Sequence, residues 1–488
     1  MIQQHFATKG LCLALFLSMF LGCQNSDDQT VTEGDFAARG LSQAQGSLLL
    51  DNSVRILGPQ GEPVQGARIL IGAAPGVPFT GNEIIADSQG IFTIPSSWTT
   101  AQPVTIEALG YVRTSFDAIS PVAQDYYVAF ADSTTPMNVK GTPLDYRNVR
   151  RDGKVDFGLV MPTFTREELI NFDLSNVLAT DNDMISVLGF DLNVPSNLTL
   201  PNQEESYFFP ITLHKPNYRL PVKRPGTHTF IAAHGQFPMS QVFDQIRSGA
   251  SIFDVANDLT FLRGGTKDVT IASGTVSADI SVNQIEFSAQ SELKAPAYGT
   301  GKLVFGLGAM ETNGSFHTTD MKILKPNQKM KLRVPAQGNI YKLAVLLNQA
   351  PPADYAIPDF SQLSLSLQAG SDTRVATFLP MIAAPRVVNN VATMTPPAAT
   401  AGIRPVSTYL ILSELETVTG GAVPLVKRTR LWELKSAAWV SSVNLPEFQF
   451  VRKPNRQYKW EVQYLGQDET LPADSTEFTH ITRNSSLF

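Results

Sequence analysis

The sequence predicts an all-β protein, built of tandem β-sandwich domains with a few short helices. Its apolar residues stand in short runs rich in β-branched and aromatic side chains, and Gly, Pro, Asn and Asp separate these runs. Within several runs apolar and polar residues alternate, which is the period of a half-buried strand. The chain has 488 residues and is 43% hydrophobic, so it holds enough apolar surface for several globular domains.

The first 22 residues form a predicted signal peptide. Lys9 gives a weakly positive head, and an apolar run from Gly10 to Gly22 follows it. A bilayer-spanning helix needs about 20 apolar residues, so this run is too short to span and a cleaved secretory signal is the better interpretation. The run stops at Cys23, after which the chain becomes polar and acidic.

The border Phe20-Leu21-Gly22-Cys23 resembles the lipobox of bacterial lipoproteins. The resemblance implies that the Cys23 thiol receives a diacylglyceryl group, that the signal is removed, and that the new amino terminus is acylated. In such lipoproteins an Asp directly after the cysteine retains the protein in the inner membrane. Gln24 stands at this position, so the resemblance implies sorting to the outer membrane. Each buried CH₂ contributes about 0.8 kcal/mol, so three acyl chains would bind a membrane firmly. The alternative is an ordinary secretory signal with an incidental cysteine.

Cysteine usage and charge exclude several classes of function. Cys12 leaves with the signal, so Cys23 is the only cysteine of the mature chain, and no disulfide, catalytic thiol or Cys-based zinc site is expected. The formal net charge is −6, or −7 once Lys9 is removed, and no long basic run is present, which argues against a nucleic-acid partner. Residues 23–46, the lipidated cysteine and a polar stretch, are predicted to be a flexible tether.

Residues 47–134 are predicted to form the first folded domain. The stretch from Gly58 to Gly61 breaks its first strand, and Asp87-Ser88-Gln89-Gly90 is a turn in which Gly90 suits a positive φ. Around these turns apolar residues share one face at a period of two. The residues that alternate in this way are Ala67, Ile69 and Ile71, then Phe92 and Ile94, then Val104, Ile106 and Ala108.

Three short motifs give this domain a family resemblance. They are the G-x-P-x-x-G-A of Gly61, Pro63, Gly66 and Ala67, the D-x-x-G-x-F of Asp87, Gly90 and Phe92, and the pair Gly110-Tyr111. Together they resemble the carboxypeptidase regulatory-like domain, a small transthyretin-like β-sandwich of exported bacterial proteins. The resemblance covers about residues 50–130 and implies a spacer or interaction module. It implies no chemistry, because the matching residues belong to turns and core.

The remaining chain is predicted to be mainly β. Residues 135–320 are expected to form a domain of unknown family with short helices, and residues 321–398 a β-rich region and linker. Thr165-Arg-Glu-Glu168 resembles a capping box that opens a short helix. A second helical pattern within 240–260 has one apolar face, formed by Val242, Ile246, Phe253 and Ala256.

Residues 399–488 are expected to form a last β-sandwich. In its closing strand the residues of one face alternate with those of the opposite face. This pattern loosely resembles an immunoglobulin- or fibronectin-like domain. One face carries Tyr458, Trp460, Val462 and Tyr464, and the other carries Lys459, Glu461 and Gln463. Core packing is the favoured interpretation of Trp432 and Trp439, and the alternative is a sugar-stacking platform.

Histidines are the strongest catalytic candidates, namely His214, His228 and His234. His228 and His234 would share one side of a strand but lie about 20 Å apart, so only a sharp bend near Ala232–Ala233 could bring them to one metal ion. Surface or hydrogen-bonded histidines are therefore the favoured interpretation. The calcium-type oxygens of Asp181-Asn182-Asp183 are more typical of an acidic turn.

The sequence thus predicts one functional site, the lipidated Cys23, with no catalytic, cofactor-binding or metal-binding residue. The predicted function is that of a lipid-anchored envelope protein, sorted to the outer membrane, with a non-enzymatic binding or structural role toward a glycan or another envelope protein. The alternative is an anchored hydrolase that acts on envelope glycan or peptide and has its site within residues 135–320, where the histidines and the acids Asp181 and Asp183 concentrate.

Overall fold

The computed structural model confirms the predicted all-β class, because the part of the chain that it describes is nearly all strand. Ser240–Gln241 and Asp244–Gln245 are helical, and the four apolar residues of the predicted helix face lie outside the described residues. Among the described residues no helix has the length and apolar character needed to cross a membrane. The described residues are 52–58, 61–131, 137–145, 153–162, 164–165, 182–187, 190–195, 218–222, 225–238, 240–241, 244–245, 257–312, 315–348, 359–418, 425–446, 456–472 and 477–488.

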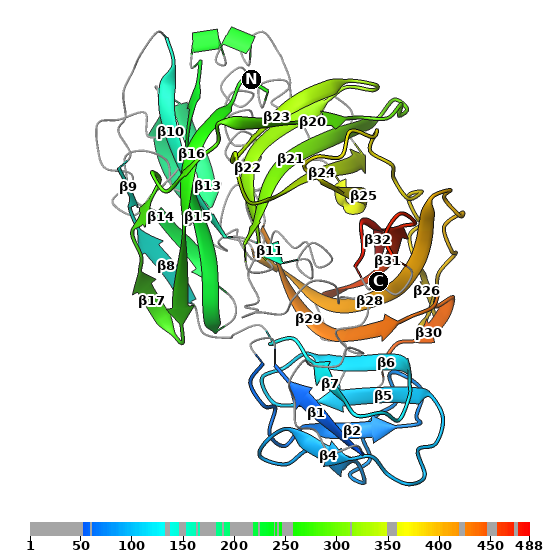
Figure 1. Ribbon diagram of the computed structural model, residues 1–488. Coiled ribbons are helices and arrows are strands. Elements are labelled where there is room, and N and C mark those ends of the chain that lie inside the picture. Colours follow the sequence, from blue (N-terminus) through cyan, green and yellow to red (C-terminus); the bar gives the residue numbers. More distant parts are fainter. Residues whose placement is uncertain are drawn as a thin grey trace.

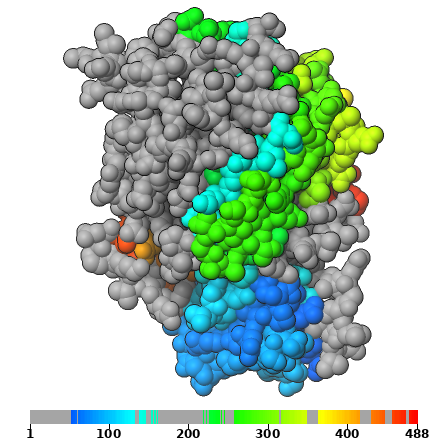
Figure 2. Space-filling view, turned by 90° about the vertical axis from the view of Figure 1, so that its left-hand side faces the viewer, coloured from blue at the N-terminus to red at the C-terminus, as the bar shows by residue number. Residues whose placement is uncertain are grey.

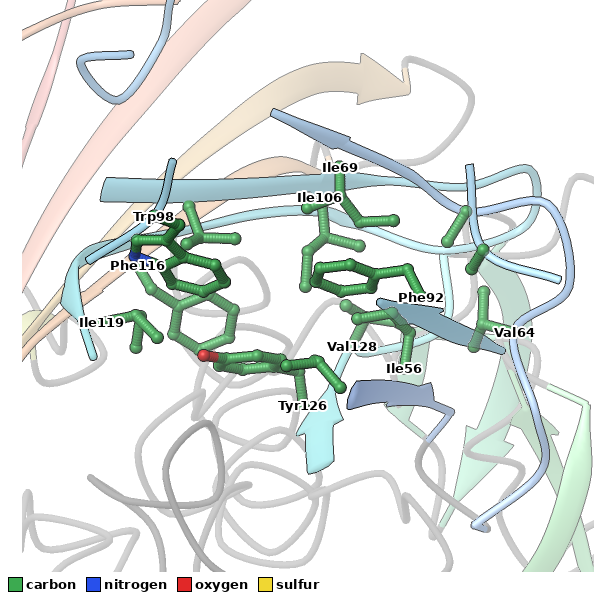
Figure 3. Packing of buried hydrophobic residues seen from close by; sticks show 14 residues of the cluster. Ile56, Val64, Ile69, Phe92, Trp98, Ile106, Phe116, Ile119, Tyr126 and Val128 are labelled. Atoms are coloured by element: carbon green, nitrogen blue, oxygen red, sulfur yellow. The ribbon is translucent and has the colours of Figure 1, made fainter. Parts of the chain in front are cut away.

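The first unit consists of two layers of strands that enclose one apolar core (Figure 3). One layer has the order β4-β1-β7, and the other has the order β6-β5-β2-β3. The predicted alternation is confirmed, since Ile69, Val104 and Ile106 are at most 1% exposed and lie in this core with Phe92. The strands are β1 (Ser53–Leu57), β2 (Arg68–Ile71), β3 (Ile84–Ile85), β4 (Ile91–Thr93), β5 (Gln102–Glu107), β6 (Arg113–Ile119) and β7 (Gln124–Tyr127).

The turn at Asp87–Gly90 shows why the sequence folds this way locally. Asp87 Oδ1 accepts hydrogen bonds from the backbone N–H of Gln89 and of Ile91, at 2.8 and 2.9 Å. Gly90 has φ +70°, and a Cβ at this position would lie 2.4 Å from the Ile56 carbonyl oxygen. Glycine is therefore required here for both backbone conformation and space.

A single sheet of 13 strands runs through most of the molecule and ends in the first unit (Figure 1). Its order is β11-β22-β21-β24-β25-β32-β31-β28-β29-β6-β5-β2-β3, and all neighbours are antiparallel except β29 and β6. Figure 1 shows the part from β22 to β29 as a curved wall, with β6 beside β29. The further strands are β11 (Phe164–Thr165), β21 (Lys302–Thr312), β22 (Ser315–Leu324), β24 (Asn339–Asn348), β25 (Asp359–Ala369), β28 (Ile403–Val418), β29 (Leu425–Ser436), β31 (Gln457–Asp468) and β32 (His480–Leu487).

Two small sheets pack against one face of this long sheet. Leu293 and Leu332, from β20 and β23, share an apolar cluster with residues of β21, β22 and β24. Ala392 and Val443, from β27 and β30, share a second cluster with residues of β28, β29 and β31. The strands of these covers are β20 (Ala289–Lys294), β23 (Lys329–Val334), β26 (Arg386–Val388), β27 (Val391–Thr393) and β30 (Ser442–Asn444).

The remaining described strands form a separate group beside β22. Its largest sheet has the order β10-β15-β16-β19, and Lys322 Nζ on β22 donates to the Leu259 carbonyl just before β16. In Figure 2 this group, in cyan and green, lies next to the blue first unit at one end of the molecule. The strands are β8 (Met137–Gly141), β9 (Pro143–Leu144), β10 (Val155–Pro162), β12 (Asn182–Val187), β13 (Phe190–Pro195), β14 (Tyr218–Val222), β15 (Gly226–Phe237), β16 (Thr260–Ile271), β17 (Gly274–Ser277), β18 (Ile280–Ser281) and β19 (Ile285–Glu286).

Strand pairing crosses the predicted domain boundaries, which remain predictions. Residues 321–398 contribute β25, which pairs with β32 of residues 399–488. Met394 lies in one apolar cluster with Leu410, so the boundary at residue 398 falls within packed structure. Cys23 and the rest of residues 1–46 lie outside the described residues, as does Glu168 of the predicted capping box.

Candidate functional site

The two described histidine candidates lie on one strand, β15, and do not converge. His228 pairs with Val269, and the ladder to β10 and β16 continues without interruption through Ala232 and Ala233. The register shift in this strand lies between His234 and Gly235, after the pair. Six residues of extended strand separate the two rings by about 20 Å. The bend that a shared metal site would require is therefore absent.

His234 is held in a buried group of polar side chains. Arg263 Nε donates to His234 Nδ1 at 3.1 Å, so the ring proton belongs on Nε2, which lies 3.7 Å from Asp156 Oδ1. Gln236 Nε2 donates to the same Asp156 oxygen at 2.7 Å. Burial lowers the pKa of His234, and Asp156 opposes this shift. A neutral imidazole oriented by an arginine and a carboxylate follows from this arrangement.

The same arginine links the group to a turn on the surface. Arg263 Nη2 donates to the Asp145 carbonyl at 3.3 Å, and Ser281 Oγ donates to Asp145 Oδ2 at 2.6 Å. The hydroxyl of Ser281 is thus bonded to a carboxylate. These contacts join β10, β15, β16 and β18 and resemble a structural network more than a nucleophile activated by a base.

The other catalytic candidates are not brought to His234 by the described residues. His214 and Asp181 lie outside the described residues, and Asp183 is on β12, which pairs with β13. Within the part of the chain that the structure describes, no three His, Cys, Asp or Glu side chains lie close enough to share a metal ion.

The tryptophan candidates belong to packed structure. Trp432 is fully buried and stacks on Trp460, with 5.8 Å between ring centroids and 28° between planes. Trp439 packs against the same apolar cluster and meets Tyr464 edge to face at 5.4 Å. Core packing, the favoured interpretation of Trp432, is confirmed.

A set of charged and polar side chains lies on the opposite face of the same strands, and sequence reasoning did not single it out. On β28, residues Tyr409, Ile411 and Ser413 alternate with the core residues Leu410 and Leu412, so they point to the other face. Across this face a basic row is followed by an acidic row and then by a second basic row. The rows are Arg430–Ser413–Lys459, Glu433–Ile411–Glu461 and Lys435–Tyr409–Gln463–Arg483. We call Arg430, Glu433, Lys435, Lys459, Glu461, Gln463 and Arg483 the ionic lattice.

A β-bulge creates one half of the ionic lattice. The register of β28 and β29 shifts so that Leu412 faces Trp432 and Ser413 faces Arg430, which leaves Leu431 as the extra residue. This shift turns Arg430 and Glu433 to the same face, although three positions separate them. Arg430 Nη1 consequently lies 2.7 Å from Glu433 Oε1 in a buried ion pair.

Glu461 is the centre of the other half. Its Oε2 lies 3.2 Å from Lys459 Nζ, and its Oε1 lies 3.9 Å from Arg483 Nη1. Gln463 Nε2 also donates to Glu461 Oε1. Glu461 and Arg483 are at most 2% exposed. Buried, mutually paired charges of this kind suit the fixing of strand register, because a slipped register would leave them without counterions.

Part of the signal for this lattice is visible in the sequence. The alternation predicted for the closing strand is confirmed, with Tyr458, Trp460 and Val462 in the apolar cluster. Its other face carries Glu461 and Gln463, which are buried as well. Alternation can predict that these side chains share a face. It cannot predict which distant strands lie beside them.

Comparison with known proteins adds no relative to this description. No protein-family model and no curated protein matches the chain.

Proposed function

We propose that this chain is a lipid-anchored protein of a Gram-negative-type envelope, placed on the outer membrane, with a non-enzymatic binding or structural role. The anchor is supported by the lipobox-like border Phe20-Leu21-Gly22-Cys23, and outer-membrane placement by Gln24. Acyl chains on Cys23 would bind membrane lipid, and the polar residues up to 46 would tether the folded body to it.

The non-enzymatic role is supported mainly by the 13-stranded sheet, which joins the first unit to the strands of the later part of the chain. Its conspicuous polar groups are used in packing: Arg430 pairs with Glu433, and Glu461 pairs with Lys459. On the neighbouring sheet, Arg263 Nε donates a hydrogen bond to His234 Nδ1. A body whose charges stabilise its own strands is suited to presenting surfaces.

One exposed feature of the first unit fits a contact with a partner. Leu109 is fully exposed at the tip of the β5–β6 hairpin. Two residues further along the chain, Tyr111 stacks on Phe130, with ring centroids 5.2 Å apart. An apolar tip backed by stacked rings suits contact with a glycan face or with another envelope protein. The resemblance to carboxypeptidase regulatory-like domains agrees with a module of this type.

The anchor is tested by replacing Cys23 with alanine. We expect Cys23→Ala to move the protein from the membrane fraction to a soluble or signal-retaining form, because the acylated thiol is lost. Cys12→Ala is the matched control, since Cys12 is removed with the signal and this variant should stay membrane-bound. A Cys23→Ala protein that remains in the membrane fraction like its parent would disprove the anchor.

A hydrolase remains the second candidate because of one contact, the 3.7 Å approach of His234 Nε2 to Asp156 Oδ1. A histidine oriented by a carboxylate is one component of acid–base catalysis. Purified protein should therefore be assayed against peptidoglycan and envelope polysaccharide, beside the variant His234→Gln. Hydrolysis that this variant abolishes would replace the binding role with an enzymatic one.

A further inference from the structure

The sheet that holds β15 and β16 meets the long sheet along β22, beside which it lies in Figure 1. One end of this contact is hydrogen-bonded. Asn257 Nδ2 donates to the Ile323 carbonyl at 3.0 Å, and the Ile323 N–H donates to Asn257 Oδ1 at 2.7 Å. Lys322 Nζ donates to the Leu259 carbonyl at 2.6 Å. We call the contact of β22 with β15 and β16 the seam.

The other end of the seam holds a buried histidine. His317 on β22 is 1% exposed, and neither of its ring nitrogens has a hydrogen-bond partner among the residues that the structure describes. A neutral imidazole offers one donor and one acceptor, and buried groups of this kind are hydrogen-bonded in most proteins. In the closed seam a second ring proton would find no acceptor among these residues.

Within the described part of the chain, Asp268 of β16 is the charged group that acts on His317. Its carboxylate raises the pKa of the ring, but burial has the larger effect and lowers that pKa to about 4. Asp268 Oδ1 also accepts a hydrogen bond from Thr229 Oγ1 of β15 at 2.7 Å. At this end of the strands the other titratable or charged residues are His228 of β15, Lys267 of β16, Glu311 of β21, Arg333 of β23 and Asp320 of β22, and β11 has none. One carboxylate thus offsets only part of the cost of charging the buried ring.

An open seam would expose the His317 ring to solvent. Water would then accept hydrogen bonds from both ring N–H groups, so protonation stabilises the open state relative to the closed one. Each sheet keeps its own hydrogen bonds, since β15 pairs with β10 and β16, and β22 pairs with β21. The bonds between Asn257 and Ile323 involve no titratable group, so that end of the seam can act as a hinge.

We propose that the seam is an acid-sensitive joint, in which protonation of His317 separates the sheet of β15 and β16 from β22 while both sheets stay folded. With a pKa of about 4 in the closed state and the ordinary 6.5 in the open state, the opening equilibrium should rise about 20-fold from pH 7 to pH 5. Such opening is local and precedes any unfolding of the chain. It depends neither on the lipid anchor nor on the binding role.

Thiol labelling measures the opening, because the chain has two cysteines, Cys12 in the predicted signal and Cys23, and the soluble mature form with Cys23→Ser has none. Met310 lies opposite His317 in the ladder of β21 and β22 and is 8% exposed, so Met310→Cys places a buried thiol at this end of the seam. Its labelling rate, relative to the same variant unfolded in urea at the same pH, should rise about 20-fold from pH 7 to pH 5. Adding His317→Leu should leave less than about a twofold rise, whereas adding the control His480→Leu, on β32, should leave the full rise.

A second thiol position separates local from global opening. Ala344→Cys lies in the apolar cluster of β20 to β24, so it reports on global unfolding and should be labelled at least about tenfold more slowly at pH 5. The proposal is overturned if labelling of Met310→Cys does not depend on pH, if it rises equally with His317→Leu, or if it matches that of Ala344→Cys.

A distance measurement decides the question if His317→Leu does not fold. Thr270 on β16 and Lys331 on β23 are both exposed, so spin labels on Thr270→Cys and Lys331→Cys report the separation of the two sheets with His317 in place. A longer distance that gains population on acidification would support the joint. One unchanged distance distribution between pH 7 and pH 5 would overturn it.

Discussion

Two buried histidines are expected to make the stability of this protein depend on pH. His317 on β22 is 1% exposed and His480 on β32 is 4% exposed. Burial lowers the pKa of each to about 4, from an ordinary value of 6.5. His480 Nδ1 lies 2.8 Å from Thr479 Oγ1, so its neutral ring also takes part in a hydrogen bond. Both rings are therefore kept neutral by the fold.

The stability of the protein should fall as the pH drops from 6.5 to 4. In the unfolded chain these histidines take up protons below pH 6.5, whereas in the folded chain they do so only near pH 4. Protonation therefore favours the unfolded chain between these two pH values, and the full stability of the folded chain is present only above pH 6.5. Each lowered pKa corresponds to roughly 3 kcal/mol over this range. Urea unfolding should show that, between pH 7 and pH 4, the His317→Leu variant loses less free energy of unfolding than the parent does. The difference between the two losses should be about that amount. A loss equal to that of the parent would contradict the burial of His317, and His480→Leu serves as the parallel case.

At the scale of elements, we infer that the ionic lattice helps to fix how β28, β29, β31 and β32 pair. Its opposite face is apolar, with Trp432 stacked on Trp460, and such a face alone tolerates sliding by two residues. The charged rows add a pattern that only one register satisfies. The bulge at Leu431 is part of this pattern, because it brings Arg430 and Glu433 to one side.

Removing one charge from the lattice should cost far more than removing a balanced pair. Glu461→Gln leaves Lys459 and Arg483 without their carboxylate, and we expect a loss of about 3–5 kcal/mol in the free energy of unfolding. The double variant Glu461→Leu/Arg483→Met removes both signs and should be less destabilised than the single variant. Urea unfolding measures both, and a single variant within 1 kcal/mol of the parent, about the value of an exposed pair, would show that the lattice is solvated.

At the scale of the molecule, the parallel pairing of β6 with β29 makes the first unit an extension of the long sheet. Further contacts secure the junction: Ser436 Oγ donates to Asp117 Oδ2 at 3.2 Å, and a Cβ on Gly76 would lie 3.1 Å from the Asn444 carbonyl oxygen. A spacer linked only by a flexible hinge would have no such contacts. The unit and the last strands share one hydrogen-bonded sheet.

Residues 53–127 and residues 403–487 should consequently lose protection in one transition. Hydrogen exchange at increasing urea concentration follows both regions in the same sample, and we expect their amides to open at the same midpoint because the sheet is shared. A midpoint for the first unit clearly below that of β28 and β31 would show that it is an independent domain docked weakly on β29.

The sequence alone was sufficient for the fold class and for local structure. The turn at Gly90 and the faces of Ile69, Phe92 and Trp460 follow from residue type and a period of two, which depend only on near neighbours. The lipobox-like border at Cys23 is likewise a local signal, and the anchor stays a prediction. Local pattern suffices wherever the physical cause lies within a few residues.

Tertiary structure decided what local pattern could not. Arg113 meets Trp432, more than 300 positions away, and this pairing joins the first unit to the long sheet. The burial of Glu461 beside Ile411 of β28 and the approach of His234 to Asp156 of β10 also depend on strands that do not follow each other in the sequence. The two faces of a strand can be read from the alternation of its own residues. The strands that pair with its edges and the segments that pack on its faces are set by contacts between remote parts of the chain. These contacts leave no periodic pattern in the local sequence.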